Sequence, residues 1–452
     1  MAAKSCIATS EKLAYGLGDA AANVVFQLQI SFLLYFYTDV FGLLAGTAGV
    51  VLLVSRLADA LYGIAVGAIA DRTRSRWGQY RIWVLGSAVP LAIALVLTFA
   101  SPGVSAHGKI LWAAITYNAL MIAYAAHNIP YSALVGVMTD DANERTSLAS
   151  WRFMGAMAMA LVVNTFTLDL VKWFGAGDDA RGFLLTAIAW SAAVVALSVV
   201  TFLGTAERVP AATKQRTPLR QDLIDLLRNR SWIVLFLLAV LVYVQLSLRS
   251  GTLLFYFKHF VGRERLFGAF NGVGLAVTLV GIMLSEPLSA RFGKRRLFGV
   301  CLVVTALVMS LFALVPPGWP WLLFALQVPL QLAFGPTIPL MWSMMADVID
   351  LLEWKTGRRS AALAFGSLVF GFKLGAGVGG WLSGASLEYF GYVAGGAIPA
   401  AAANGTRWIV SILPAAFLLA SAALLWLYPI DETLVTKMEA ALRECRMRRD
   451  AR

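Results

Sequence analysis

Long apolar runs alternate with short polar segments along almost the whole chain of 452 residues. A helix needs about 20 predominantly apolar residues to cross the hydrocarbon core of a bilayer. The pattern predicts twelve such helices, near residues 14–37, 45–70, 81–101, 108–138, 149–172, 183–204, 231–257, 267–289, 297–315, 319–346, 361–388 and 407–428. We therefore expect an all-α membrane protein, because a helix satisfies its own backbone hydrogen bonds within lipid.

The longest polar interruption, residues 205–230, contains Pro210, Pro218 and charges of both signs. Within it, the apolar spacing of residues 222–228 predicts a short surface helix. The interruption separates six predicted helices from six. The expected organisation is an N-terminal six-helix bundle at 1–204, a cytoplasmic linker at 205–230, a C-terminal six-helix bundle at 231–430 and a cytoplasmic tail at 431–452.

Weak internal similarity supports two related halves. The segment after the second helix, 70–81, resembles the segment after the eighth, 289–296, and Arg152 in the fifth helix has a counterpart in Lys373 of the eleventh. Two related six-helix halves around a site near the bilayer midplane are the architecture of major facilitator transporters. Chance similarity between basic loops is the alternative.

Composition agrees with a membrane protein, since 59% of the residues are hydrophobic and only 14% are charged. That leaves too few polar groups to cover a water-soluble globule of this length. The formal net charge of +12 does not indicate a nucleic-acid partner, because the basic residues are spread over alternate loops. The positive-inside rule places these loops and both termini in the cytoplasm. Lys258, Arg263 and Arg265, in a predicted outer loop, are the exception. We expect a monomer in the bacterial cytoplasmic (inner) membrane, surrounded by lipid.

Nothing in the sequence indicates catalysis or a resident cofactor. We find no phosphate-binding loop, no metal-ligand spacing and no nucleophile motif. The three cysteines, Cys6, Cys301 and Cys445, are scattered and are expected to be reduced. The three histidines are too dispersed for a metal site, and His127 is expected to be structural.

Six segments of the chain carry motifs, at residues 15–23, 35–40, 56–60, 71–78, 128–132 and 346–358. Together they resemble the glycoside-pentoside-hexuronide:cation symporter family, the melibiose permease-like branch of the major facilitator superfamily. The resemblance covers essentially the whole chain, and each motif alone would be weak. Membership implies a cation-coupled symporter of a small sugar, with no enzymatic activity.

Asp59 is the leading candidate for coupling transport to a cation. An ionisable residue inside a membrane span is costly and is a functional candidate by default. Arg56 lies one helical turn away, so a static Arg56–Asp59 pair is the alternative. The resemblance implies that Asp59 matches one of two acidic cation ligands, whereas the second position is Gly63 here and the Asn usually near it is Tyr62. One carboxylate offers sodium few oxygens, so the sequence favours a proton over sodium.

The resemblance also implies a set of substrate-binding positions: Asn23, Tyr124, Asn128, Arg152, Trp342 and Lys373. Asp19, which follows Gly18 in the first helix, is expected to line the same cavity. Two of them, Asn23 and Asn128, are amides where the family has sugar-binding carboxylates, and amides still pair with sugar hydroxyls. Trp342 could stack on a sugar ring or simply pack. Fewer acids beside Arg56, Arg152 and Lys373 favour an anionic sugar such as a hexuronide.

Paired charges at the cytoplasmic ends of helices are expected to form a gate that opens and closes between two states. In the first half these are Asp71, Arg72 and Arg76, with Arg74 and Arg81, and in the second half Asp347, Asp350, Glu353 and Arg358, with Lys355. A purely topological role is the alternative. The rival functions are a carrier of a lipid or drug with the same fold, and a non-transporting membrane sensor.

Overall fold

The computed structural model describes residues 7–139, 141–208, 219–356, 361–393, 399–431, 433–435, 437, 438 and 441. Every regular element in these ranges is helical, which agrees with the predicted all-α class. In the first half the elements are α1 (Thr9–Gln27), η1 (Leu28–Phe32), α2 (Leu33–Tyr35), η2 (Phe36–Val40), α3 (Ala45–Ala70), α4 (Arg81–Thr98), α5 (Ala106–Met138), α6 (Ala142–Gly175) and α7 (Asp179–Gly204).

The second half begins with α8 (Leu219–Arg228), which is the short helix expected in the linker. It continues with α9 (Arg230–Phe255), η3 (Tyr256–Phe260), α10 (Leu266–Met283), α11 (Ser285–Phe292), α12 (Lys294–Leu311), η4 (Phe312–Leu314), α13 (Pro320–Phe334), α14 (Thr337–Thr356), α15 (Ala361–Tyr389), α16 (Ala400–Val410) and α17 (Ile412–Leu425). η1, η2 and η3 are π-helical turns, and η4 is a 3₁₀ turn.

Within the described residues, 12 helical segments are long and apolar enough to cross a membrane, as the sequence predicted. Four boundaries differ from the prediction by five residues or more. The first span begins at Thr9 and the twelfth at Ala401, both earlier than predicted, and two other spans differ at their ends. The eighth span ends at Met283 and a separate helix, α11, follows it, while the tenth extends to Lys355. The tenth span is longer because apolar residues between its acids, including Val348, Ile349 and Leu352, are buried and continue the helix.

The chain folds into two compact units. Unit 1 contains residues 1–213, 250–272 and 380–405, and unit 2 contains residues 214–249, 273–379 and 406–452. Unit 1 thus combines the first six spans with segments from the second half of the sequence. The proposed boundaries at 205–230 stay a prediction.

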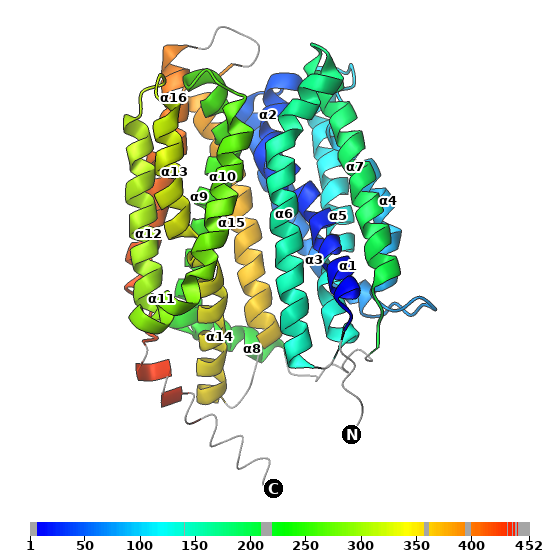
Figure 1. The fold of residues 1–452 in the computed structure, drawn as a ribbon, viewed down its shortest axis with the longest axis vertical. Helices are drawn as coiled ribbons and strands as arrows, with labels where there is room; N and C mark the ends of the chain where they lie inside the picture. The colour runs from blue at the N-terminus through cyan, green and yellow to red at the C-terminus, as the bar shows by residue number, and fades with distance from the viewer. Residues whose placement is uncertain are drawn as a thin grey trace. The chain divides into compact units, whose positions relative to one another are not determined.

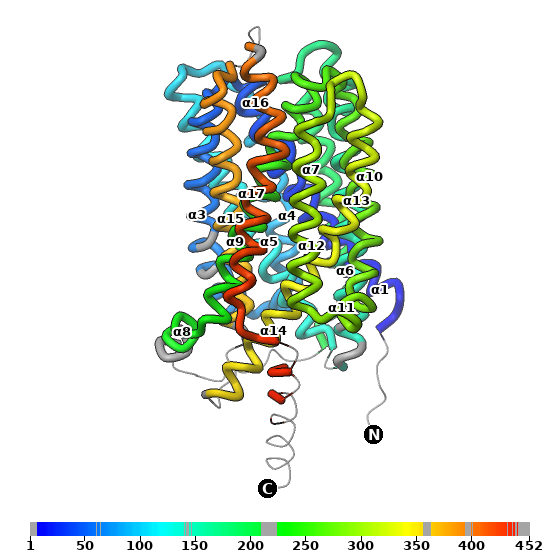
Figure 2. Tube along the Cα trace, turned by 90° about the vertical axis from the view of Figure 1, so that its left-hand side faces the viewer, coloured from blue at the N-terminus to red at the C-terminus, as the bar shows by residue number. Residues whose placement is uncertain are grey.

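In unit 1, α1 lies beside α6 and α7, and α3 lies beside α5 (Figure 1). Small residues permit the closest of these contacts. A methyl group added at Gly155 of α6 would lie 2.2 Å from the backbone oxygen of Gly16 on α1, and one at Gly18 would lie 2.3 Å from the ring of Tyr131 on α5. These glycines bring polar residues of α1 close to α5 and α6. In unit 2, α12 runs beside α13 and α17 (Figure 2).

Candidate functional site

An ion pair between α1 and α6 forms the centre of the polar cluster in unit 1. The Arg152 Nε lies 3.1 Å from Asp19 Oδ1. The Arg152 guanidinium lies over the Tyr131 ring, 5.2 Å from the ring centroid. Asn23, one turn beyond Asp19, donates to the Asp19 backbone oxygen at 3.2 Å. The structure therefore brings together three of the predicted substrate-binding residues.

A second group of predicted residues lies on α5. The Asn128 side-chain amide donates to the Tyr124 hydroxyl at 2.8 Å, and the Ser132 hydroxyl donates to Asn128 Oδ1 at 3.2 Å. These residues are four positions apart and share one face of the helix. Such a row of hydroxyl and amide groups can both donate to and accept from sugar hydroxyls.

The candidate coupling residues occupy the interior of α3. Asp59 is 1% exposed and Arg56 is 8% exposed. Arg56 donates to Gln29 Oε1 at 2.9 Å and interacts electrostatically with Asp59 and Tyr117. The Arg56–Asp59 proximity predicted from their spacing is thus present, together with Gln29 and Tyr117, which the sequence analysis missed.

Tyr124 connects the two polar groups of unit 1. It interacts electrostatically with Asp19 of the predicted substrate-binding residues and with Arg56 and Asp59, the candidate coupling residues. A change in the charge of Asp59 therefore alters the electrostatic potential at Tyr124. The Tyr124 hydroxyl also accepts a hydrogen bond from Asn128.

Two further polar residues near the α3–α5 interface, Ser55 and Asn118, were missed. Tyr62 donates to Asn118 Oδ1 at 3.0 Å, and the Asn118 amide donates to Ser55 Oγ at 2.9 Å. Ser55 precedes Asp59 by four positions and lies on the same face of α3. The spacing of Ser55 was a visible signal, whereas Asn118 needed the packing of α5 against α3.

In unit 2, the predicted residues accompany an aromatic cluster. Trp342 on α14 contacts Phe372 at 5.6 Å between ring centroids, and Phe372 stacks on Tyr243 of α9 at 4.2 Å. Lys373 follows Phe372 directly and is half-buried. Trp342 remains 40% exposed, so one part of its ring is available for contact.

The loop after α3, predicted to be part of a gate, is held by Glu207, a residue that the sequence analysis missed. Its carboxylate accepts three backbone N–H groups at 2.8 Å, from Gln79, Tyr80 and Arg81 at the start of α4. Gly78 (φ +106°) lets the carboxylate approach, because a methyl group there would lie 2.6 Å from it. A carboxylate at a helix N-terminus is stabilised by the exposed N–H groups and the helix dipole.

Some gate residues of this loop form hydrogen bonds or contact an aromatic ring, and others are exposed. The Tyr80 hydroxyl donates to Asp71 at 3.0 Å, and burial, with this hydrogen bond, raises the pKa of Tyr80 to about 12. Arg81 sits over the Phe202 ring and donates to its backbone oxygen. Arg72 and Arg74 are exposed, and Arg76 lies over the Trp77 ring at 4.5 Å.

The corresponding charges of unit 2 lie on α14. Lys294 binds both oxygens of Asp347, at 2.8 and 3.0 Å. Asp350 and Glu353 follow at intervals of three residues and are half-buried. Arg358, the last of the predicted gate residues, lies outside the described residues.

A cluster at one end of unit 1, absent from the sequence analysis, joins segments from both halves of the chain. The Tyr392 hydroxyl donates to both oxygens of Asp39, at 2.7 and 2.8 Å, and Lys258 lies 3.3 Å from Asp39 Oδ1. Lys258 also donates to the Tyr35 hydroxyl, and His259 lies 3.2 Å from the Tyr392 hydroxyl. Burial, and then Asp39, raise the pKa of Tyr392, so it stays protonated and can donate.

The cluster is built on an internal repeat. Residues 33–42 read LLYFYTDVFG and residues 253–262 read LLFYFKHFVG. Both segments form a π-helical turn in the same register, η2 and η3, and both end in a glycine with positive φ. The repeat places Asp39 opposite His259 in the alignment and beside Lys258 in space. This similarity was the signal available in the sequence.

Comparison with known proteins decides the family. Residues 14–432 match the family described as MFS/sugar transport protein. The chain belongs to this family. It is 34% identical over 433 residues to the putative glycoside/cation symporter YagG of Escherichia coli, covering 96% of this chain and 94% of that protein.

A second relative is the glucuronide carrier protein homolog of Escherichia coli, which is 30% identical over 92% of this chain and 92% of its own length. The D-xylose-proton symporter structure shares the fold, with a TM-score of 0.68 at 15% identity over 95% of this chain and 99% of that one. The expected glycoside-pentoside-hexuronide:cation symporter family and the major facilitator fold are confirmed.

Proposed function

We propose that this chain is a secondary active transporter that couples the movement of a cation to the uptake of a sugar, glycoside or hexuronide by alternating access. Relatives along nearly its whole length are named as a glycoside/cation symporter and a glucuronide carrier. The observation that carries the proposal is the position of Tyr124. It interacts with the candidate coupling pair Arg56–Asp59 and also with Asp19 and Asn128 of the candidate sugar cluster.

The coupling ion in this proposal is a proton. Asp59 is the one carboxylate of its helix segment that the family resemblance assigns to cation binding, and Gly63 removes the second. A buried carboxylate can gain or lose one proton without a full set of oxygen ligands, which sodium requires. Ser55 and Asn118 offer neutral oxygens near this part of α3, and for that reason sodium is included in the test.

The favoured substrate is an anionic sugar. Lys373 supplies positive charge, and Asn23 and Asn128 stand where carboxylates would repel an anion. Arg152 adds a guanidinium that also pairs with Asp19. The retained hydroxyls, amides and charges also argue against a lipid or drug as cargo, because an apolar molecule would leave these groups unsatisfied. The printed names of the relatives, a glycoside/cation symporter and a glucuronide carrier, favour transport over the sensor alternative.

In this proposal the protein lies in the bacterial cytoplasmic membrane with both termini in the cytoplasm and works as a monomer. The loops rich in arginine and lysine support that orientation by the positive-inside rule. The gate residues Asp71, Arg72, Arg76, Asp347, Asp350 and Glu353 would then lie on the cytoplasmic side.

The test is proton movement in weakly buffered, de-energised cells that express the protein. Alkalinisation of the medium upon addition of a glucuronide, but not of β-xylosides, glucosides or galactosides, is the expected result. Alkalinisation with a neutral glycoside alone would reject the anionic preference. If radiolabelled sugar enters only with sodium and the pH of the medium does not change, the coupling ion is sodium instead of a proton. If no sugar changes the pH and no radiolabel enters, sugar symport is rejected.

A further inference from the structure

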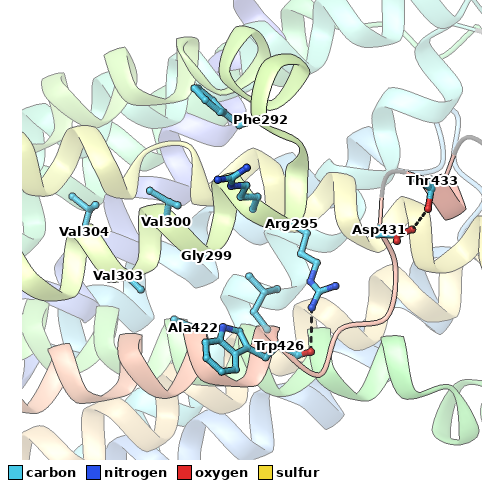
Figure 3. A pocket seen from close by; sticks show the side chains of 12 residues that line it. Phe292, Arg295, Gly299, Val300, Val303, Val304, Ala422, Trp426, Asp431 and Thr433 are labelled. Carbon is cyan, nitrogen blue, oxygen red and sulfur yellow. Dashed lines mark hydrogen bonds between the residues drawn. The ribbon is translucent and has the colours of Figure 1, made fainter.

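A groove in unit 2 combines apolar walls with a cationic end (Figure 3). It has a volume of about 750 Å³ and runs between α12 and α17. Its walls include Gly299, Val300, Val303, Val304, Ala422 and Leu425. Gly299 deepens the groove, because a methyl group there would lie 3.2 Å from Leu425 Cδ2. Val300 is 53% exposed, so the groove offers apolar surface that is not covered within the structure.

The cationic end is formed by the first turn of α12. Arg295 and Arg296 line the groove there, and the turn contains no acidic residue. The Arg295 guanidinium is positioned by a hydrogen bond of 3.1 Å to the Trp426 backbone oxygen, and the Trp426 side chain lies almost fully exposed at the same end. Two guanidinium groups at a helix N-terminus are electrostatically unfavourable for the helix unless an anion is near.

Among the described lining residues, the carboxylate of Asp431 lies at the edge of the groove, and it already accepts hydrogen bonds from neighbouring residues. It accepts hydrogen bonds of 2.8 Å from the Leu434 backbone N–H and the Thr433 hydroxyl, which lower its pKa. Among the residues that the structure describes, the end of the groove therefore has two arginines and one ionised acid. This balance favours a ligand with net negative charge over a zwitterion.

The position of the groove along the membrane span identifies the kind of molecule that fits. Its apolar walls belong to candidate membrane spans, while Arg295 and Arg296 lie at the end of one, where headgroups begin. Tryptophan and basic residues favour this interfacial depth. Basic pockets between transmembrane helices on the cytoplasmic side bind anionic lipid headgroups.

We propose that this groove is a binding site for one anionic phospholipid. Its phosphodiester contacts Arg295 and Arg296, and an acyl chain lies along the apolar walls of α12 and α17. The site serves a resident lipid rather than a transported one, and binding does not depend on the proposed sugar function.

Native mass spectrometry of the purified full-length chain in detergent tests the site. The probe is 1-palmitoyl-2-oleoylphosphatidylglycerol, compared with phosphatidylcholine of the same chains and with inorganic phosphate. Each basic residue near the surface contributes about 1 kcal/mol to anionic lipid binding. The double variant Arg295→Gln, Arg296→Gln should therefore raise the dissociation constant of the tightest phosphatidylglycerol by about thirtyfold.

Two further variants separate this site from general effects. Arg263→Gln with Arg265→Gln removes the same charge from exposed residues elsewhere and should leave the tightest binding unchanged. Val300→Trp fills the groove without changing charge and should also weaken binding. The proposal would be overturned if the Arg263/Arg265 variant lost as much affinity, or if phosphatidylcholine bound equally well. It would also be overturned if both groove variants bound phosphatidylglycerol unchanged, or if inorganic phosphate alone competed fully.

Discussion

At the scale of single residues, Asp59 decides whether transport can be concentrative. Its carboxylate is buried beside Arg56, so replacing it with an amide removes the group that can gain and lose a proton. Asp59→Asn should abolish accumulation of sugar against a gradient, while exchange of internal for external sugar persists. Counterflow and concentrative uptake in membrane vesicles measure the two separately. Accumulation at the wild-type level would show that coupling lies elsewhere.

Tyr124 tests the connection between the ion and the sugar at the same scale. Its hydroxyl accepts a hydrogen bond from Asn128 and interacts with both Asp19 and Asp59. Tyr124→Phe keeps the ring and removes the hydroxyl, at a cost of about 1–3 kcal/mol for the partners left unpaired. We expect sugar affinity to fall about tenfold and its dependence on pH to become flatter. Tyr62→Phe, a matched loss of one hydroxyl that donates to Asn118, should leave the pH dependence in place.

At the scale of elements, sequence patterns predicted what depends on neighbouring residues and missed what depends on packing. Apolar runs gave twelve spans because the hydrocarbon thickness sets helix length. The spacing of Arg56 and Asp59 likewise implied their proximity. Glu207, in contrast, caps the start of α4 although it lies 126 to 128 positions further along the sequence. No local sequence pattern predicts such a contact. The extension of α14 was missed because its acids resemble the start of a loop until Val348 and Ile349 are seen to be buried.

The candidate site shows the same division. Family resemblance pointed to Arg152, and the position of Asp19 in the first helix pointed to the cavity. Only the close approach of α1 and α6 at Gly16 and Gly155 shows why the two can pair. The repeat in residues 33–42 and 253–262 was present in the sequence and was overlooked, because its charges differ while its apolar and glycine positions agree.

At the scale of the whole molecule, the Asp39 cluster joins segments from both halves of the sequence. Asp39 belongs to the first helix, whereas Lys258 and Tyr392 come from the second half of the chain, and all three lie in unit 1. In an alternating-access cycle such a contact must break when this end of the molecule opens. In the orientation proposed from the positive-inside rule this end faces outward, since within unit 1 it lies at the other end of α3 from the arginine-rich residues 72–81.

Weakening the cluster should therefore favour the outward-open state. The Lys258–Asp39 pair is partly exposed, so we assign it about 1 kcal/mol, which corresponds to an approximately fivefold shift in population. In a chain whose native cysteines are replaced by serine, a cysteine at the buried Ser31 should react about fivefold faster with a membrane-impermeant maleimide when Lys258 is changed to Gln. Lys109→Gln is the matched control. Lys109 also binds the end of the first membrane span, at the Phe41 backbone oxygen, but it belongs to the first half of the sequence. Equal acceleration in both variants would mean that local loosening exposes Ser31, whereas acceleration confined to Lys258→Gln identifies a contact that opens with the transport cycle.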